Sequence, residues 1–322
     1  MTSNNGDMTN SWTSSVSEKG EYVRKTTTFR KTVTADGSSG FKAEADRYHL
    51  YVSLACPWAH RTLIGRKLKG LEEVLPYTVV DWLLGPGGWN FTDKKPKCSL
   101  DTVNNAKFLK EIYKKADADY EGNITVPVLW DKKTSTIVNN ESAEILRMLN
   151  TEFNEFCATD KQKKIDFYPK DLQGKIDELN DWIFPKINNG VYRAGFATKQ
   201  AAYDTAVHEL FEALDKVEDI LSKNRYLTGD QLTEADIRLF TTLVRFDTVY
   251  VGHFKCNKKR ILDYPNMWGF VRDIYQTGCI AETVDQEHIQ NHYQQSHKSI
   301  NPSGIVAIGP DLDFDAPHGL GK

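Results

Sequence analysis

The sequence has few cysteines and lacks the spacings that would give them a structural role. Five cysteines occur in 322 residues, at positions 56, 98, 157, 256 and 279, and no two of them form a CxxC pair. Such scattered, odd-numbered cysteines are typical of neither a disulfide framework nor a zinc site. We therefore expect no bound metal and a reducing compartment, the cytosol.

The sequence also lacks a strong excess of charge of one sign. Lys and Arg number 41 against 44 Asp and Glu, which gives a formal net charge of −3. A dedicated nucleic-acid-binding protein carries a broad basic surface, so this balance argues against a nucleic-acid partner.

Long hydrophobic runs are missing as well. No segment approaches the ~18 consecutive apolar residues that a membrane-spanning helix needs. Residues 1–18 are rich in Ser, Thr and Asn, whereas a secretory signal has a charged and then an apolar region. We expect no membrane association and no export.

Hydrophobic and aromatic residues are abundant, by contrast. Hydrophobic residues make up 40% of the chain, and there are 7 Trp, 14 Tyr and 15 Phe. This composition is that of a globular protein, and the length suits about two domains of ~150 residues each. So many aromatic side chains favour a binding pocket lined by aromatic rings.

The first part of the chain divides into a polar tail and a mixed domain. Residues 1–45 are polar and are expected to form an N-terminal tail, at most draped on the body. Residues 46–155 then read as strand, helix, strand, insertion, strand, strand, helix. The strands are expected near 48–52, 77–82, 124–130 and 136–138, and the helices after Pro57 and after Ser142.

The second half is helical. Apolar residues recur at helical spacing from 172 to 183 and from 207 to 221. Thr233 and Asp236 form a capping box that starts a further helix, and another follows Pro265. We predict a helical domain over 165–290 and an extended C-terminal tail over 291–322. The fold class is thus α/β followed by all-α.

Cys56 is the sharpest candidate for chemistry. It stands where the first strand gives way to a helix, directly before Pro57 at the helix start. Free backbone N–H groups and the helix dipole stabilise a thiolate there, so we expect a lowered pKa and a nucleophilic sulfur. Three residues on stands Ala59, so any resolving thiol must come from solution. An inert buried cysteine is the plain alternative.

The glycine-rich stretch and the histidines do not form recognisable ligand sites. The glycines at 85, 87 and 88 lack the Lys-Ser/Thr pair of a phosphate-binding loop. His288, His292 and His297 lack a third ligand at metal-binding distance, so we expect a solvated helix face. His60 is expected to pack or cap locally, although it could tune the field at Cys56.

Several motifs, in the order in which they occur along the chain, resemble those of the Xi-class glutathione transferases, which are the glutathionyl-hydroquinone reductases. The resemblance covers about residues 20–310 and rests on CPWAHR at 56–61, GWNF at 88–91, TVPVLWD at 125–131, NNES at 139–142, and LTGD at 227–230 followed by TEADI at 233–237. The capping motif alone would indicate only a glutathione-transferase helical domain.

The resemblance implies a thioredoxin-like domain that binds glutathione as co-substrate and an all-helical domain that binds the second substrate. Val126 would offer its backbone to the cysteinyl part of glutathione beside a cis bond at Pro127. Glu141 and Ser142, at a helix start, would hold the γ-glutamyl end, and Trp89 would lie against the tripeptide. The alternatives are an edge strand that ends at Pro127, ordinary helix capping by Glu141 and Ser142, and a surface or core tryptophan at Trp89.

Three tyrosines match the substrate side of the family: Tyr192, Tyr250 and Tyr293. Phenols stack on aromatic rings and donate to a developing phenolate oxygen, although core packing is the alternative. One departure concerns Asn123, where the family pattern leads us to expect an arginine contacting glutathione. An amide cannot replace a guanidinium fork, so we expect weaker glutathione binding or another cation.

The favoured activity is reduction of glutathionyl-hydroquinones through a mixed disulfide on Cys56, releasing hydroquinone and oxidised glutathione. An omega-like thiol transferase or dehydroascorbate reductase uses the same lone thiolate and is the first alternative. A non-catalytic module of the same fold is the second. The resemblance also implies a homodimer that pairs through the helical domains.

Overall fold

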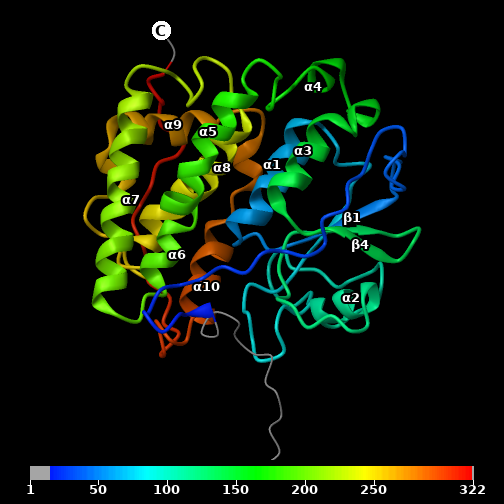
Figure 1. The fold of residues 1–322 in the computed structure, drawn as a ribbon, viewed down its shortest axis with the longest axis horizontal. Coiled ribbons are helices and arrows are strands. Elements are labelled where there is room, and N and C mark those ends of the chain that lie inside the picture. The colour runs from blue at the N-terminus through cyan, green and yellow to red at the C-terminus, as the bar shows by residue number, and fades with distance from the viewer. Residues whose placement is uncertain (1–14, 321–322) are drawn as a thin grey trace, which may run out of the picture.

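The protein, described by a computed structural model over residues 15–320, consists of a sheet-containing unit followed by a helical one (Figure 1). Four strands, β1 (Tyr48–Val52), β2 (Tyr77–Val79), β3 (Val128–Asp131) and β4 (Thr136–Asn139), lie in the order β2-β1-β3-β4. β1 pairs parallel with β2 and antiparallel with β3, and β3 pairs antiparallel with β4. The predicted mixed domain is thus present.

The sheet is covered on both sides by helices. Helices α1 (Pro57–Leu68) and α3 (Ser142–Thr151) lie on one side and α2 (Leu109–Ala116) on the other (Figure 1). All five residues of β1 are buried, as expected of a central strand covered on both faces. Helix α2 lies in the segment expected to be a polar insertion, and only Leu109, Ile112 and Tyr113 of its eight residues are buried, so its apolar pattern is weak.

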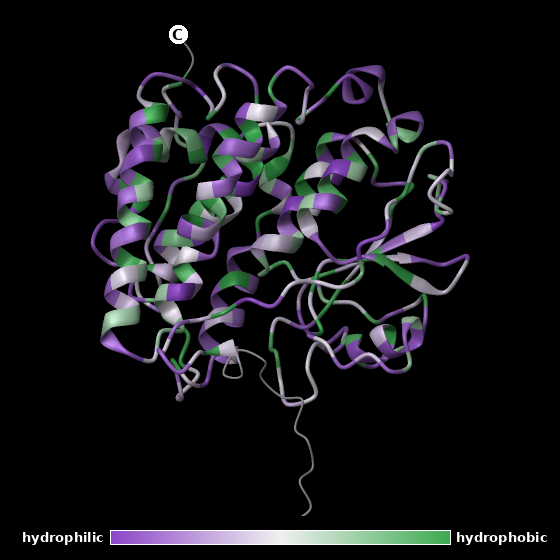
Figure 2. Ribbon diagram, in the orientation of Figure 1, coloured by the Kyte–Doolittle hydropathy of each residue, from purple (hydrophilic) through white to green (hydrophobic). Residues whose placement is uncertain are grey.

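The second unit is built from helices, as predicted. Figure 2 shows α7 banded in purple and green, the pattern of a helix with one buried side. The helical elements are α4 (Asp160–Lys163), α5 (Gln173–Ile183), α6 (Gly190–Gly195), α7 (Gln200–Leu221), α8 (Glu234–Arg245), α9 (Pro265–Tyr275), α10 (Gln286–Ser296) and the π-helical turns η3 (Phe184–Asn188) and η4 (Phe246–Tyr250). Short 3-10 turns are η2 (Asn154–Phe156), η5 (Ile261–Asp263) and η6 (Ile280–Thr283).

The predicted capping box at the start of α8 is confirmed. The Asp236 carboxylate accepts from the Leu227 and Thr233 backbone N–H groups and from the Thr233 hydroxyl, each at 2.8 Å. All three groups are buried, so each would lose a partner that water cannot replace.

Replacing Asp236 by Ala is therefore expected to lower the free energy of unfolding by about 3 kcal/mol, because buried donors would be left unpaired. Urea unfolding followed by circular dichroism measures this change. Asp171→Ala removes an exposed carboxylate and should leave the unfolding midpoint unchanged. Equal midpoints for wild type and Asp236→Ala would contradict the expectation.

The prediction of an N-terminal tail is wrong for residues 15–45, which pack along both units. Tyr22, Val33 and Phe41 are buried, and the Lys31 backbone N–H donates to the carbonyl of Val138, in β4, at 3.0 Å. The error has a physical reason. Single aromatic and branched residues anchor an otherwise polar segment that has no periodicity of its own.

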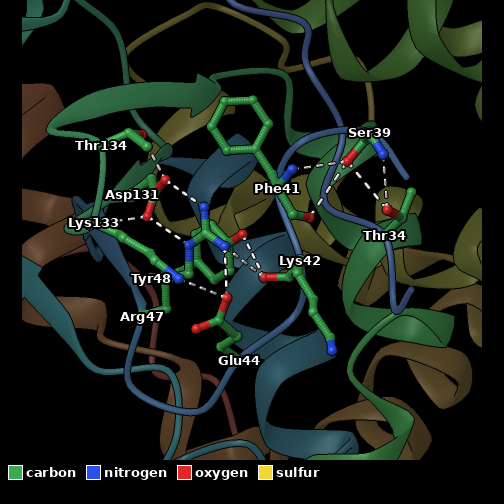
Figure 3. A network of polar contacts seen from close by, with 10 residues as sticks. All are labelled: Thr34, Ser39, Phe41, Lys42, Glu44, Arg47, Tyr48, Asp131, Lys133 and Thr134. Atoms are coloured by element: carbon green, nitrogen blue, oxygen red, sulfur yellow. Dashed lines mark hydrogen bonds and ion pairs between the residues drawn. The ribbon is translucent and has the colours of Figure 1, made fainter. Parts of the chain in front are cut away.

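A polar network ties the end of this segment to the sheet (Figure 3). The Arg47 guanidinium makes a two-point ion pair with the buried Asp131 carboxylate, at 2.9 and 2.8 Å, and also bonds Glu44. The Tyr48 hydroxyl donates to the Lys42 carbonyl at 2.7 Å. These bonds fix where the segment enters β1.

The predicted boundary at residue 291 is also wrong, because α10 continues to Ser296. The remainder is extended, as expected, but it lies on the helical unit (Figure 1). Phe314 is buried against Trp268 and Tyr275, and Gln276 donates to the Phe314 and Ala316 carbonyls. Within residues 15–320, none of the helices has the length and apolar character that crossing a membrane would require.

Candidate functional site

A cavity of about 560 Å³ lies between the two units. Its walls come from the N-terminal segment, the starts of α1 and α3, the stretch before β3, and the helical unit. The lining residues used below are Tyr22, Arg24, Thr27, Cys56, Trp58, Trp89, Asn123, Val126, Glu141, Ser142, Asn189, Tyr192, His292, Tyr293 and His297. Seven of the eight predicted site residues are among them, and Tyr250 is not.

Cys56 occupies the position that its sequence context predicted. It is the N-cap residue of α1, with Pro57 in the first helical position, and its sulfur lies 3.6 Å from the Val126 carbonyl oxygen. The side chain keeps part of its surface exposed. The candidate nucleophile therefore lies at a helix N-terminus, next to the backbone that precedes β3.

The expected lowering of the Cys56 pKa is not found. Burial raises the pKa of the Cys56 thiol above its ordinary value. The backbone N–H groups of Ala59 and Trp58 and the guanidinium groups of Arg245 and Arg24 act in the opposite direction without overcoming it. The helix start favours the thiolate as predicted, but the sequence did not reveal that the atoms packed around the sulfur desolvate it enough to outweigh this effect.

The start of α3 forms a second polar corner of the cavity. Glu141 caps the helix, with its carboxylate accepting from the Ala143 N–H at 3.2 Å and from the Thr27 hydroxyl at 3.4 Å. The Arg61 guanidinium donates to the Ser142 hydroxyl at 3.3 Å from the buried side. A carboxylate and a hydroxyl at a helix N-terminus together suit a ligand that carries both an amine and a carboxylate.

Two tryptophans form apolar parts of the wall. Trp89 stacks on the His292 ring with centroids 5.1 Å apart. The Arg24 and Arg61 guanidinium carbons both lie over the Trp58 ring, 4.7 and 4.5 Å from its centroid. Such cation–π contacts help to hold the ring and the two guanidinium groups in place.

The three predicted tyrosines meet at their hydroxyl groups. Tyr293 Oη lies 2.5 Å from Tyr192 Oη and 2.9 Å from Tyr250 Oη. Burial raises the pKa of Tyr192 and Tyr293 well above the ordinary value and that of Tyr250 to about 12, so all three phenols stay protonated at neutral pH. Tyr250, in η4, stands behind the wall formed by Tyr192 and Tyr293.

The N-terminal segment contributes a cation that the sequence analysis missed. Arg24 donates from Nε to the Asn189 side chain at 2.9 Å, and its guanidinium carbon lies 4.9 Å from the Tyr192 ring centroid. One of its terminal nitrogens, Nη2, is buried and has no hydrogen-bond partner among the described residues. Its only sequence signal was a basic residue between Tyr22 and the first strand, in a segment expected to be a tail.

Comparison with known proteins decides the family. The model "Glutathione S-transferase, N-terminal domain" matches residues 55–152, and "Glutathione S-transferase, C-terminal domain" matches residues 200–273. The glutathionyl-hydroquinone reductase YqjG of Escherichia coli K12 is 59% identical over 96% of this chain and 94% of its own. The chain is an Xi-class glutathione transferase.

Solved structures agree with this assignment. The glutathione-bound structure of YqjG has a TM-score of 0.88 and 60% identity, covering 91% of this chain and 96% of that one. The Xi transferase of Phanerochaete chrysosporium has a TM-score of 0.90 and 51% identity, covering 94% and 96%. An omega-like glutathione S-transferase of Schizosaccharomyces pombe is 51% identical over 91% of this chain and 95% of its own. The predicted fold class and family are confirmed.

The expectation that the three histidines of this transferase form a solvated face is wrong. His288, His292 and His297 are all buried, because α10 packs against the loop after β2. His288 Nε2 lies 2.8 Å from the Pro96 carbonyl oxygen, and His292 Nδ1 lies 2.7 Å from that of Trp82. Burial lowers the pKa of His292 to about 4, so it is neutral at pH 7.

The described part of the transferase contains no group of three or more His, Cys, Asp or Glu residues able to hold a metal ion.

Asn123, the departure from the family pattern, lines the cavity, and its carbonyl accepts from the Tyr120 hydroxyl at 2.9 Å. Arg24 approaches the same cavity from the N-terminal segment. A cation is thus available on a different element from the one where the sequence led us to expect it.

Proposed function

We propose that this transferase reduces glutathionyl-hydroquinones through a mixed disulfide on Cys56. The observation that carries the proposal is the meeting of Cys56, the polar corner at Glu141 and Ser142, and the phenols of Tyr192 and Tyr293 in one cavity. Relatives named glutathionyl-hydroquinone reductases, 59% and 46% identical, support the same activity.

Glutathione is proposed to bind as co-substrate along the α/β side of the cavity. Val126 would pair with its cysteinyl backbone, Glu141 with its amine, Ser142 with its γ-glutamyl carboxylate, and Trp89 would pack beside it. A ligand held at both ends presents its sulfur to Cys56, which lies 3.6 Å from the Val126 carbonyl oxygen. The glutathione-bound structure of the Escherichia coli relative supports glutathione as the ligand.

The reaction then proceeds in two balanced steps. The Cys56 thiolate attacks the glutathione sulfur, the sulfur–ring bond breaks, and its electron pair goes to the ring carbon, which takes up a proton. This step yields the hydroquinone and a Cys56–glutathione disulfide. A second glutathione, as thiolate, attacks the glutathione sulfur of that disulfide and releases oxidised glutathione and the Cys56 thiolate.

The phenols assist the first step at the oxygen atoms of the ring. Tyr192 and Tyr293 are protonated at neutral pH and can donate to an oxygen on which negative charge develops. Tyr250 is assigned an indirect role, because its hydroxyl bonds that of Tyr293 and it does not line the cavity.

Arg24 is proposed to bind an anionic group of the conjugate through its buried, unpartnered nitrogen. Arg24→Met should therefore raise the KM for a glutathionyl-hydroquinone about tenfold, because a charge-assisted hydrogen bond is lost, and change kcat much less. Steady-state kinetics measure both values. Arg193→Met removes an arginine that pairs with Glu209 outside the cavity and serves as the control. An unchanged KM for Arg24→Met would exclude this role.

A second candidate function is removal of glutathione from other thiol partners or reduction of dehydroascorbate. The omega-like name of the Schizosaccharomyces pombe relative favours it. Side-by-side rates with a glutathionyl-hydroquinone and with dehydroascorbate distinguish the two, and a strong preference for dehydroascorbate would overturn the proposal. If intact-mass analysis after incubation with oxidised glutathione showed no adduct on Cys56, the protein would instead be a non-catalytic module of this fold.

We further infer a homodimer in a reducing compartment, the cytosol. The free state of the cysteines within residues 15–320 supports such a compartment.

Pairing of two subunits through their helical units remains a prediction of the family resemblance. Light scattering of the purified protein tests it.

A further inference from the structure

Arg245, the last residue of α8, is a fully buried cation that reaches from the helical unit into the sheet-containing one. Its Nε donates to the Ala55 carbonyl at 2.9 Å and its Nη2 to the Leu54 carbonyl at 3.1 Å. Its Nη1 bonds the Thr241 carbonyl at 2.7 Å and lies 3.0 Å from His60 Nδ1. All four acceptors are neutral.

The guanidinium of Arg245 has no carboxylate partner within residues 15–320. Arg47, by contrast, is held by the Asp131 carboxylate, whereas the buried Arg66 also bonds only backbone carbonyls. Burying a cation costs several kcal/mol unless an opposite charge accompanies it. Arg245 differs from Arg66 in its place, because it stands behind a residue, Cys56, that becomes an anion in the proposed reaction.

His60 supplies no anion and adds no second cation. Burial and the neighbouring guanidinium hold the pKa of His60 well below its usual value, so it is neutral. Its Nδ1 accepts from Arg245, which leaves the proton on Nε2 to be donated to the Thr283 hydroxyl at 2.8 Å. This chain from Thr283 through His60 fixes the orientation of the guanidinium.

The two carbonyls that Arg245 binds directly precede Cys56. The positive charge therefore stands behind the turn that presents the sulfur, and it lowers the pKa of the Cys56 thiol against the effect of burial. Within residues 15–320, Cys56 is the group near this cation whose charge changes in the proposed reaction. It becomes negative before attack and again when glutathione displaces it from the mixed disulfide.

We propose that Arg245 is the positioning residue of Cys56: it fixes the Leu54–Ala55 turn and stabilises the thiolate as a buried counter-charge. This inference rests on the proposed function, because it takes Cys56 as the nucleophile. It assigns to α8 a part in the chemistry, although Arg245 does not line the cavity. It also makes the docking of the two units a condition for reactivity.

The test is the pH profile of Cys56 alkylation by iodoacetamide, followed by peptide mass spectrometry in the full-length protein. Arg245→Gln should raise the midpoint of the profile by about one pH unit and reduce alkylation at pH 7 about tenfold. Binding of S-methylglutathione should stay within about twofold, which shows that the cavity is intact. A folded Arg245→Gln protein with the wild-type profile would overturn the proposal.

Two further variants separate charge from position. Arg245→Lys keeps the cation, but its three donors on one nitrogen cannot reproduce the four bonds of the planar guanidinium, so the midpoint should be retained while the limiting rate at high pH falls. A wild-type limiting rate in Arg245→Lys would contradict the positioning role even where the Gln variant fails to fold. Arg66, which is also buried and bonded to backbone carbonyls, lies near the other end of α1 and provides matched controls. Arg66→Gln and Arg66→Lys should leave the profile unchanged.

These outcomes are independent of turnover and so are distinguishable from a failure of the proposed function. If Cys56→Ala retained turnover, the assignment of the nucleophile would fall. If Cys56→Ala were inactive but Arg245→Gln kept the wild-type alkylation profile, only the role of Arg245 would fall.

Discussion

Cys56→Ala is expected to lower turnover of a glutathionyl-hydroquinone by about 10³-fold or more, because no other cysteine among residues 15–320 lines the cavity to form the mixed disulfide. Stopped-flow or chromatographic detection of the released hydroquinone measures this loss. The variant should still bind S-methylglutathione, since the proposed binding residues Glu141, Ser142 and Trp89 are unchanged.

Cys157→Ala is the matched control for this experiment. Cys157 is also partly exposed, but it follows η2 and does not line the cavity. Its removal should leave both turnover and glutathione-adduct formation at the wild-type level. Near-normal turnover by Cys56→Ala would refute the mixed-disulfide mechanism, whatever the behaviour of Cys157.

Tyr293→Phe is expected to reduce kcat by about 10²-fold with little change in KM, because a donor aimed at developing charge acts mainly in the transition state. Tyr293 stands at the centre of the phenol cluster, bonded to both Tyr192 and Tyr250. Tyr250→Phe should cause a smaller loss, since that phenol holds Tyr293 without lining the cavity.

Tyr264→Phe makes the same chemical change elsewhere. The Tyr264 hydroxyl is bonded to Asp215 at 2.8 Å, and the ring is buried outside the cavity. Its kcat should equal that of wild type. If Tyr293→Phe and Tyr264→Phe had the same kcat, the tyrosine cluster would be core packing, which was the alternative in the sequence analysis.

Local patterns predicted the elements whose signals are contained in a few neighbouring residues. The strand at Tyr48–Val52, the helix that begins at Pro57 and the cap at Thr233 all lie where the sequence placed them. Each depends on short-range physics: alternation of buried residues, a missing N–H at the first helical position, and a side chain that satisfies free backbone donors.

The errors concern residues whose environment comes from distant parts of the chain. The histidines of α10 look solvated in the sequence, but the loop after β2 covers them. Arg24 stands in a polar segment, yet its partner Asn189 is 165 residues away. No local periodicity reports such contacts, because burial of a polar side chain depends on which acceptors another element supplies.

The amino-acid sequence by itself determined the four strands, the helices that begin at Pro57 and Ser142, the cap before α8 and the position of a lone cysteine at a helix start. Only the tertiary structure decided that an N-terminal arginine lines the cavity, that Tyr250 stands behind Tyr293, and that Arg245 lies buried behind Cys56. The reason is that local backbone preference is written in adjacent residues, whereas desolvation and charge pairing arise only when separate segments pack together.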